Sequence, residues 1–196
     1  MTLVALLRHA PTDWNRDKRL QGRADIAITA SSRAELATRR VPAPYDNWRT
    51  LSSPLARCLD TAAALGLVVT PEPRLVEMDW GAYQGQTIDE LRQRHGADFG
   101  ANERRGLDML PPGGESPRQV QARVAPLLAA IARDGRPTLL VTHRGVIRAV
   151  YAAAVGWTMT GDPPHALELY GTLQVFALDA NGAPRIEALN VALAHR

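Results

Sequence analysis

The chain has 196 residues, of which 45% are hydrophobic and 22% are charged, a composition ordinary for a globular protein and sufficient for one full core. Its formal net charge of +3 is small, and acids are interleaved with bases, so no face for nucleic acid stands out. A single cysteine, Cys58, excludes an internal disulfide and a zinc site built on thiolates. No segment reaches the about 20 apolar residues that a membrane span needs. We therefore expect one cytoplasmic domain over residues 1–196 with no nucleic-acid or membrane partner, and the oligomeric state stays open.

The first half of the chain alternates short apolar runs with helix signals. Residues 2–7 are a predicted buried strand, and residues 8–28 a predicted polar loop. Thr29 can cap a helix over about residues 30–40, and residues 48–51 are a short strand candidate. Pro54 then opens a predicted helix that Gly66 stops, followed by a strand candidate over residues 67–69.

The second half begins with a capping box at residues 87–90, which predicts a helix to about Arg94. Residues 96–115 are rich in Gly and Pro and are predicted to be irregular; a second capping box at 116–119 starts a helix to about Arg133. A strand over 138–142, a helix over 145–155 and a hairpin of strands 172–178 and 185–189 complete the chain. This alternation predicts a three-layer α/β/α sandwich with a mixed, mainly parallel sheet.

Two of the predicted strands are followed at once by a histidine next to an arginine. Residues 2–7 lead into Arg8 and His9, and residues 138–142 lead into His143 and Arg144. In an open α/β sheet the ligand crevice lies at the carboxyl ends of the strands, so both imidazoles are expected in one crevice. Imidazoles beside fixed cations suit an anion, above all a phosphoryl group that a histidine attacks.

The residue types around this crevice fit a phosphate monoester, which carries about −1.5 to −2 charges near neutral pH. Arg8 and Arg57 are the leading cations, because a guanidinium matches two phosphate oxygens and Arg57 lies at a predicted helix start. A histidine nucleophile needs one unprotonated nitrogen and an acceptor for the other, which the sequence does not name. Glu77, among apolar neighbours, is the best-placed acid to protonate the leaving alkoxide.

Six ordered blocks over nearly the whole chain resemble the histidine phosphatase superfamily, the phosphoglycerate-mutase-like proteins. They are residues 7–15 (LRHAPTDWN), 21–29 (QGRADIAIT), 53–62 (SPLARCLDTA), 77–85 (EMDWGAYQG), 112–116 (PGGES) and 142–148 (THRGVIR). Ala10-Pro11 stands where Gly-Glu is usual in that family, and Gln84 where Glu is usual.

The resemblance implies a phosphoglycerate-mutase-like fold and a role for each matching residue. His9 would be the phosphorylated nucleophile and Glu77 the proton donor. Phosphoryl and substrate contacts would come from the following residues: Arg8, Asn15, Gln21, Gly22, Arg57 and His143. The family needs no metal or other cofactor, so the expected ligand is a small phosphomonoester.

We weigh four functions. A phosphomonoesterase working through phosphohistidine is favoured. A cofactor-dependent mutase of the phosphoglycerate type is second, because the chain is short and lacks an arginine-rich insertion beyond Arg104-Arg105. A catalytically silent phospho-ligand-binding module has no need of Glu77. A metal hydrolase using His9, His143, Glu77 and Asp79 is disfavoured by the charge of Arg8 beside its ligands.

Overall fold

Six strands form one mixed sheet in the computed structural model, which covers residues 1–196. Their bounds are β1 (Thr2–Arg8), β3 (Arg49–Ser52), β4 (Thr70–Pro71), β5 (Thr138–Thr142), β6 (Thr172–Leu178) and β7 (Pro184–Ala192). The strand order is β4-β3-β5-β1-β6-β7. The first four strands in this order are mutually parallel, and β6 and β7 join as antiparallel strands. A separate two-stranded sheet pairs β2 (Arg39–Arg40) with β8 (Ala194–His195).

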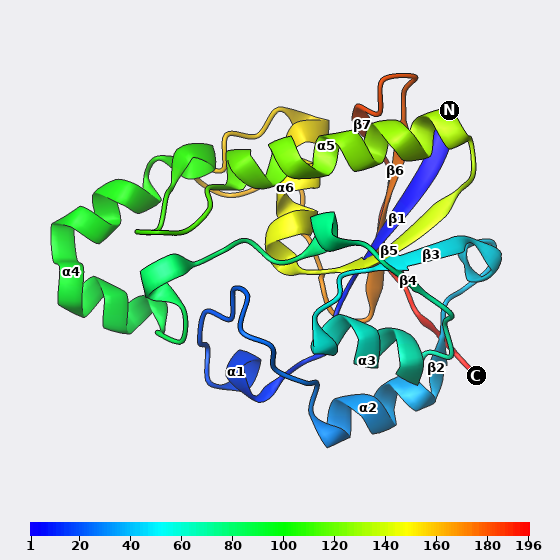
Figure 1. Cartoon of the computed structure of the whole chain (residues 1–196), viewed down its shortest axis with the longest axis horizontal. Coiled ribbons are helices and arrows are strands. Elements are labelled where there is room, and N and C mark those ends of the chain that lie inside the picture. Colours follow the sequence, from blue (N-terminus) through cyan, green and yellow to red (C-terminus); the bar gives the residue numbers. More distant parts are fainter.

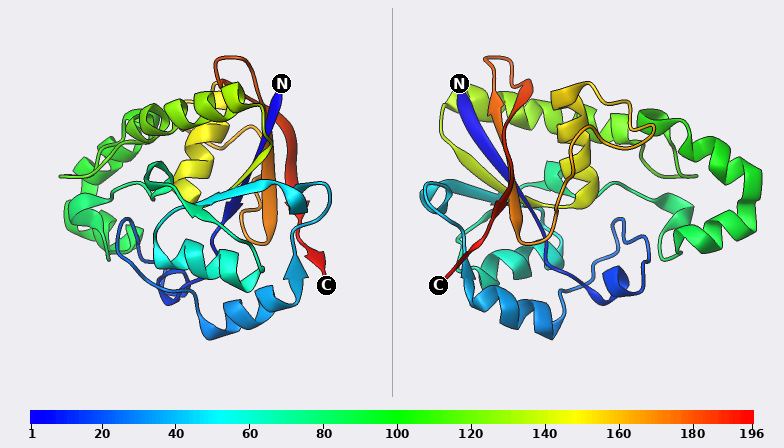
Figure 2. Two further views of the ribbon diagram at one scale, coloured as in Figure 1. Left: turned by 45° about the vertical axis from the view of Figure 1, so that its right-hand side comes forward. Right: turned by 180° about the vertical axis from the view of Figure 1, so that it is seen from behind.

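Helices cover both faces of the sheet (Figure 1). On one face lie α5 (Pro117–Asp134) and α6 (Arg144–Val155), and on the other α2 (Ala30–Ala37) and α3 (Ala56–Ala64). Two further helices, α1 (Asp13–Arg16) and α4 (Ile88–Glu103), stand away from the sheet, and Figure 2 shows α4 reaching farthest out. The predicted three-layer α/β/α sandwich is confirmed. None of the helices combines the length and apolar character that a membrane span requires.

Alternation along β1 fills the two interior layers. Val4 and Leu6 pack into the larger apolar cluster, with residues of α5 and α6, whereas Ala5 and Leu7 pack into the smaller one, with Cys58 and Ala62 of α3. Because successive side chains of a strand point to opposite faces, a central strand covered on both sides must be apolar throughout. The run Leu3 to Leu7 is therefore apolar, and the first polar residue of the site, Arg8, comes only at the end of the strand.

Three predicted elements differ from the structure. The helix expected to end near Arg94 continues as α4 to Glu103 after a break at Gly96 (φ 47°, ψ −121°), so residues 96–103 are not irregular. Phe99 is buried there and packs edge-on against Tyr83, at 5.4 Å between ring centroids. The strand expected over 67–69 is β4 at Thr70–Pro71, while the 8–28 loop contains the short helix α1.

Candidate active site

Three neighbouring parallel strands, β3, β5 and β1, end at the same edge of the sheet. The residues that follow β1 and β3 are both held by β5: the His9 N–H donates to the Thr142 carbonyl, and the Ser53 N–H to the Val141 carbonyl, both at 2.9 Å. His9, His143 and Ser53 therefore come together from distant parts of the sequence. The rings of His9 and His143 lie 5.3 Å apart between centroids.

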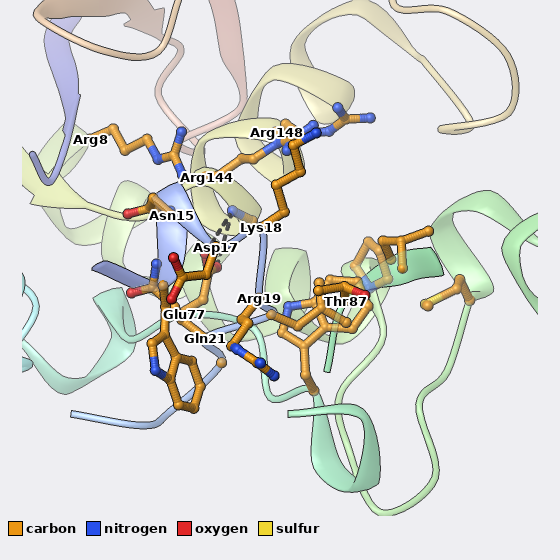
Figure 3. Close-up of a pocket in the computed structure, with 18 of the residues that line it drawn as sticks. Arg8, Asn15, Asp17, Lys18, Arg19, Gln21, Glu77, Thr87, Arg144 and Arg148 are labelled. Carbon is orange, nitrogen blue, oxygen red and sulfur yellow. Dashed lines mark hydrogen bonds between the residues drawn. The ribbon is translucent and has the colours of Figure 1, made fainter. Parts of the chain in front are cut away.

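A cleft of about 810 Å³ opens over His9. Its walls come from the 14–22 segment, α4, the start of α6 and the 157–170 segment, and Figure 3 shows part of this lining. Seven of the lining residues were expected to act in the site or line it: Arg8, His9, Asn15, Gln21, Gly22, Arg57 and Glu77. His143 is fully buried and does not line the cleft; it lies directly behind His9.

The tautomer of His9 follows from its main-chain contact. Nδ1 lies 2.7 Å from the Ala10 carbonyl oxygen, which can only accept, so Nδ1 carries the proton and Nε2 keeps its lone pair. Burial, and then the charges of Arg8 and Arg57, hold the pKa of His9 well below its usual range. The ring is therefore a neutral imidazole with a free Nε2.

The side chain of Arg8 forms no hydrogen bond or ion pair in the structure. Its Nε is buried without a partner, and its guanidinium stacks on the Tyr170 ring at 4.1 Å from the centroid. Burial lowers the pKa of Arg8, although the nearby Tyr170 and Glu77 oppose that shift. A buried donor without an acceptor is costly, so this guanidinium is suited to an anionic ligand in the cleft.

Arg57 is fully buried at the start of α3 and is held by three contacts. Its terminal nitrogens donate to the Ala24 and Gly22 carbonyls, both at 2.7 Å, and its Nε donates to His143 Nδ1 at 3.1 Å. One N–H on each terminal nitrogen remains uncommitted, because the guanidinium has five donors. The contact from Arg57 also places the proton of His143 on Nε2, which lies 2.8 Å from Ser53 Oγ.

Glu77 also borders the cleft, close enough to Arg8 and Arg57 for its charge to act on the pKa of both, and it is held by main-chain donors. Its carboxylate accepts from the Met78 N–H at 2.8 Å and from the Gly145 N–H at 3.0 Å. The dashed lines at Glu77 in Figure 3 mark the bonds from Gly145. Gly145 belongs to the first turn of α6, so the helix N-terminus faces this carboxylate. A Cβ at position 145 would collide with Glu77 Oε1, so any larger residue there would have to displace this carboxylate.

The 15–24 segment supplies polar groups on the other side of His9. Asn15 Oδ1 accepts from the Thr12 N–H at 3.0 Å as part of a capping box, which leaves its amide NH2 free. Gln21 is buried with an unpartnered Oε1, and Gly22 adopts φ +52°, next to Gln84. Gln84 Oε1 in turn accepts from the N–H groups of Arg23 and Ala24 and so holds this segment in place.

Charge around His9 is supplied by guanidinium groups. The structure contains no group of three or more His, Cys, Asp or Glu side chains arranged to hold a metal ion. Arg8 and Arg57 both lower the pKa of His9 through their positive charges, which would equally repel a cation bound there. Asp79, considered as a ligand from the sequence, instead accepts from the Gly81 N–H and lies 3.5 Å from Arg23.

Several groups at the site were missed from the sequence. Ala10 provides the acceptor for His9, Ser53 contacts His143, and Asp25 Oδ1 accepts from the Ala56 N–H at the start of α3 at 2.7 Å. Arg144 and Arg148 also line the cleft. Their spacing of four residues on a predicted helix was a readable signal for a shared helix face. The contacts of Ala10 and Asp25 have no such signal, because main-chain partners carry no residue pattern.

Comparisons with known proteins agree with this geometry. A family model described as the histidine phosphatase superfamily (branch 1) matches residues 4–192. A glucosyl-3-phosphoglycerate phosphatase of Mycobacterium tuberculosis is 34% identical over 166 residues, covering 76% of this chain and 74% of its own. A 2,3-bisphosphoglycerate-dependent phosphoglycerate mutase of Beijerinckia indica is 32% identical over 196 residues, covering 91% and 93%. A solved mycobacterial glucosyl-3-phosphoglycerate phosphatase in complex with VO3 superposes with a TM-score of 0.75 at 27% identity, covering 98% of this chain and 100% of that one.

The family match spans nearly the whole chain and both relatives exceed 30% identity. The protein belongs to the histidine phosphatase superfamily.

Proposed function

We propose that the protein is a metal-independent phosphomonoesterase that acts on a small phosphorylated metabolite through a covalent phosphohistidine at His9. The observation that carries the proposal is the state of His9: a neutral ring whose Nδ1 proton is held by the Ala10 carbonyl and whose Nε2 lone pair is free. A nucleophile in this state, beside the unpartnered guanidinium of Arg8, suits attack on a phosphate.

The first step transfers the phosphoryl group to the enzyme. Nε2 of His9 forms a bond to phosphorus as the bond to the ester oxygen breaks, and Glu77 gives its proton to the departing alkoxide. In the second step water attacks phosphorus, the P–N bond breaks, and Glu77 takes up the proton of the water. Inorganic phosphate leaves and His9 returns to its neutral form.

Around the transferring group we assign positioning and charge stabilisation. Arg8 and the two free N–H groups of Arg57 bind phosphoryl oxygens, with the amide of Asn15 as a further donor. Gln21 and the Gly22 backbone line the substrate side. His143, which lies behind His9, orients Arg57 through its Nδ1, and its own Nε2 is held by Ser53 Oγ.

The mutase alternative has an observation of its own, since a mutase matches over 91% of this chain. In that reaction the phosphoryl group of His9 returns to a substrate hydroxyl instead of to water. The phosphatase is favoured by two relatives named as phosphatases, the glucosyl-3-phosphoglycerate phosphatase reported above and a phosphoserine phosphatase of Hydrogenobacter thermophilus. A silent binding module would not need the carboxylate that Gly145 and Met78 hold at the cleft.

The test is a steady-state assay of phosphate release from p-nitrophenyl phosphate and a panel of metabolite monoesters. His9→Ala is expected to lose about a thousandfold or more in kcat/KM, because the nucleophile is removed. Its circular dichroism spectrum should match that of the wild type. Turnover retained in His9→Ala would contradict the proposal. Isomerisation of 3-phosphoglycerate that needs a bisphosphate primer, without phosphate release, would favour the mutase.

A further inference from the structure

Two arginines of α6 lie in the cleft but have no part in the mechanism above. Arg144 and Arg148 are four residues apart, so they project from one face of the helix. Both also line a smaller hollow of about 250 Å³ beside the cleft, together with Arg8 and Tyr170. Figure 3 shows the side chains of Arg8, Arg144 and Arg148 on the same side of the pocket. The apolar residues of the hollow come from the 157–170 segment: Pro163, Leu167 and Leu169.

Neither arginine has an acidic partner. The structure gives their side chains no hydrogen bond and no ion pair; the guanidinium of Arg148 lies over the face of Trp157, at 4.9 Å from the ring centroid. The acidic residues that line the cleft are engaged elsewhere or lie at its far end. Asp17 pairs with Arg16, Glu103 with Arg92, Glu77 accepts main-chain N–H groups, and Asp89 lies in the first turn of α4.

The positive charge in this hollow is therefore uncompensated within the protein. Burial lowers the pKa of Arg148 to about 10, with Arg144 adding to the shift, so Arg148 remains charged at neutral pH. The positive charge of Arg144 also lowers the pKa of Arg8, whose side chain lines both the cleft and the smaller hollow. Arg144 is exposed at the mouth of the hollow, whereas Arg148 is half-buried and carries its charge without an acidic partner. An oxyanion seated between the two guanidinium groups removes the imbalance.

We infer that Arg144 and Arg148 form a second oxyanion site next to the phosphoryl site, so that the substrate is a phosphomonoester carrying a further acidic group. This inference rests on the proposed function and narrows its substrate class. Because Arg8 lines both hollows, the two anionic groups of the substrate lie close together, as in a short diacidic metabolite. The second group is a carboxylate or a second phosphate, since a guanidinium pair binds both.

A matched pair of substrates tests the inference. Glycerol 3-phosphate and 3-phosphoglycerate differ only in a CH2OH group that replaces the carboxylate. The wild type is expected to favour 3-phosphoglycerate about tenfold or more in kcat/KM, the gain of one charge-assisted contact. In the double variant Arg144→Gln/Arg148→Gln this ratio should fall toward one. Arg133→Gln, an exposed and unpaired arginine on α5, is the control and should keep the wild-type ratio.

Further arms separate the possible outcomes. Propane-1,3-diol bisphosphate, compared with 3-hydroxypropyl phosphate, distinguishes a second phosphate from a carboxylate. Should the double variant fail to fold, Arg144→Gln alone suffices, because Arg144 is exposed. A wild-type ratio near one for both pairs, or a ratio unchanged in the variants, would overturn the second site and leave the phosphatase intact.

A binding measurement covers the case in which the proposed function itself is wrong. Calorimetric titration of His9→Ala with each compound reports affinity without turnover. If no monoester is hydrolysed by the wild type, the phosphatase proposal is overturned, and the second site is then judged on affinity alone. Tighter binding of the diacidic compounds that is lost in a triple variant with Arg144→Gln and Arg148→Gln supports the site; equal affinities contradict it.

Discussion

At His9, burial and nearby positive charge keep the ring neutral, and a neutral ring is what a nitrogen that accepts a phosphoryl group needs. Desolvation, Arg8 and Arg57 together disfavour the imidazolium, and the Ala10 carbonyl selects which nitrogen keeps its lone pair. His143 is held neutral in the same way, by burial and then by Arg57. Both rings thus serve the site at the expense of stability at low pH.

This gives a prediction for stability against pH. The folded-state pKa values of His9 and His143 lie well below 6.5, whereas the unfolded histidines titrate at about 6.5. Below about pH 6.5 the unfolded chain therefore binds more protons, and stability falls as pH falls, by up to about 1.4 kcal/mol per pH unit for each histidine. Urea unfolding between pH 7 and pH 5 measures this slope.

The matched variant for that measurement is His9→Asn, whose amide can still donate to the Ala10 carbonyl. It removes one of the two titrating rings, so its free energy of unfolding should depend less steeply on pH than that of the wild type. Equal slopes for the two proteins would contradict the neutral state assigned to His9.

Glycine at position 145 gives a second prediction. A Cβ there collides with Glu77 Oε1, so Gly145→Ala should displace the carboxylate and lower kcat about tenfold to a hundredfold, part of what an acid catalyst contributes. The control is Gly156→Ala, at the end of α6, where φ is +68° and no atom lies within 4 Å of the added Cβ. That change should cost about 1 kcal/mol of stability and leave kcat unaltered. If Gly145→Ala instead lost stability and kept the kcat of the wild type, Gly145 would serve only the fold.

Which residues of the site are predictable depends on what positions them. Arg8, His9 and Arg57 were expected because each follows a strand end or opens a helix, and local patterns report such places. The sequence did not name the acceptor for His9, because the contact to Ala10 depends on a side-chain torsion that no pattern encodes. It also gave no sign that His143 lies behind His9 instead of lining the cleft.

At the level of elements, short apolar runs and capping boxes were sufficient for most strands and helices, and the misses have physical causes. Helix α4 resumes after Gly96 because Phe99 packs against Tyr83, a tertiary contact that outweighs a weak local signal. Strand β4 lies one residue beyond the apolar run, because it is Thr70 and Pro71 that pair with β3. Leu67 and Val69 pack against the core without joining the ladder, and Val68 is exposed. Pro71 is tolerated there because β4 is an edge strand.

Helix α3 carries Arg57 in its first turn, and its start is fixed by a distant residue. Leu55 at the N-cap has no side-chain cap, and Asp25 Oδ1 accepts from the Ala56 N–H instead. Asp25→Ala should therefore cost about 1 kcal/mol of stability and raise KM, because the helix that places Arg57 loses its cap. Asp25→Asn keeps an acceptor oxygen and should behave nearly as the wild type. Thermal unfolding together with steady-state kinetics measures both effects; no difference between Ala and Asn would contradict the capping role.

At the scale of the whole molecule, the parallel order of β3, β5 and β1 brings residues 9, 53 and 143 to one edge, as the strand pattern predicted for the two histidines. The helices on either face enclose that edge and leave the cleft open above it. In the 14–22 segment, Asn15, Gln21 and Gly22 were expected at the cleft, and they line it. The 157–170 segment, which forms another wall, has no periodic signal, and its place at the cleft was not predicted.

Metal removal tests this architecture as a whole. Because Arg8 and Arg57 supply the positive charge that a metal ion would otherwise provide, activity should be unchanged after dialysis against EDTA. Phosphate release is measured before and after dialysis, with added Mg²⁺ or Zn²⁺ as the control. Activity lost on chelation and restored by one of these ions would contradict the assigned role of the arginines.

The most direct measurement is rapid chemical quench of the enzyme with a ³²P-labelled monoester, followed by peptide mapping. We predict a phosphoenzyme that is stable in base and labile in acid, formed within one turnover and mapped to His9. His9→Asn should show none. Phosphate release without any labelled enzyme intermediate, or a label on another residue, would contradict the account.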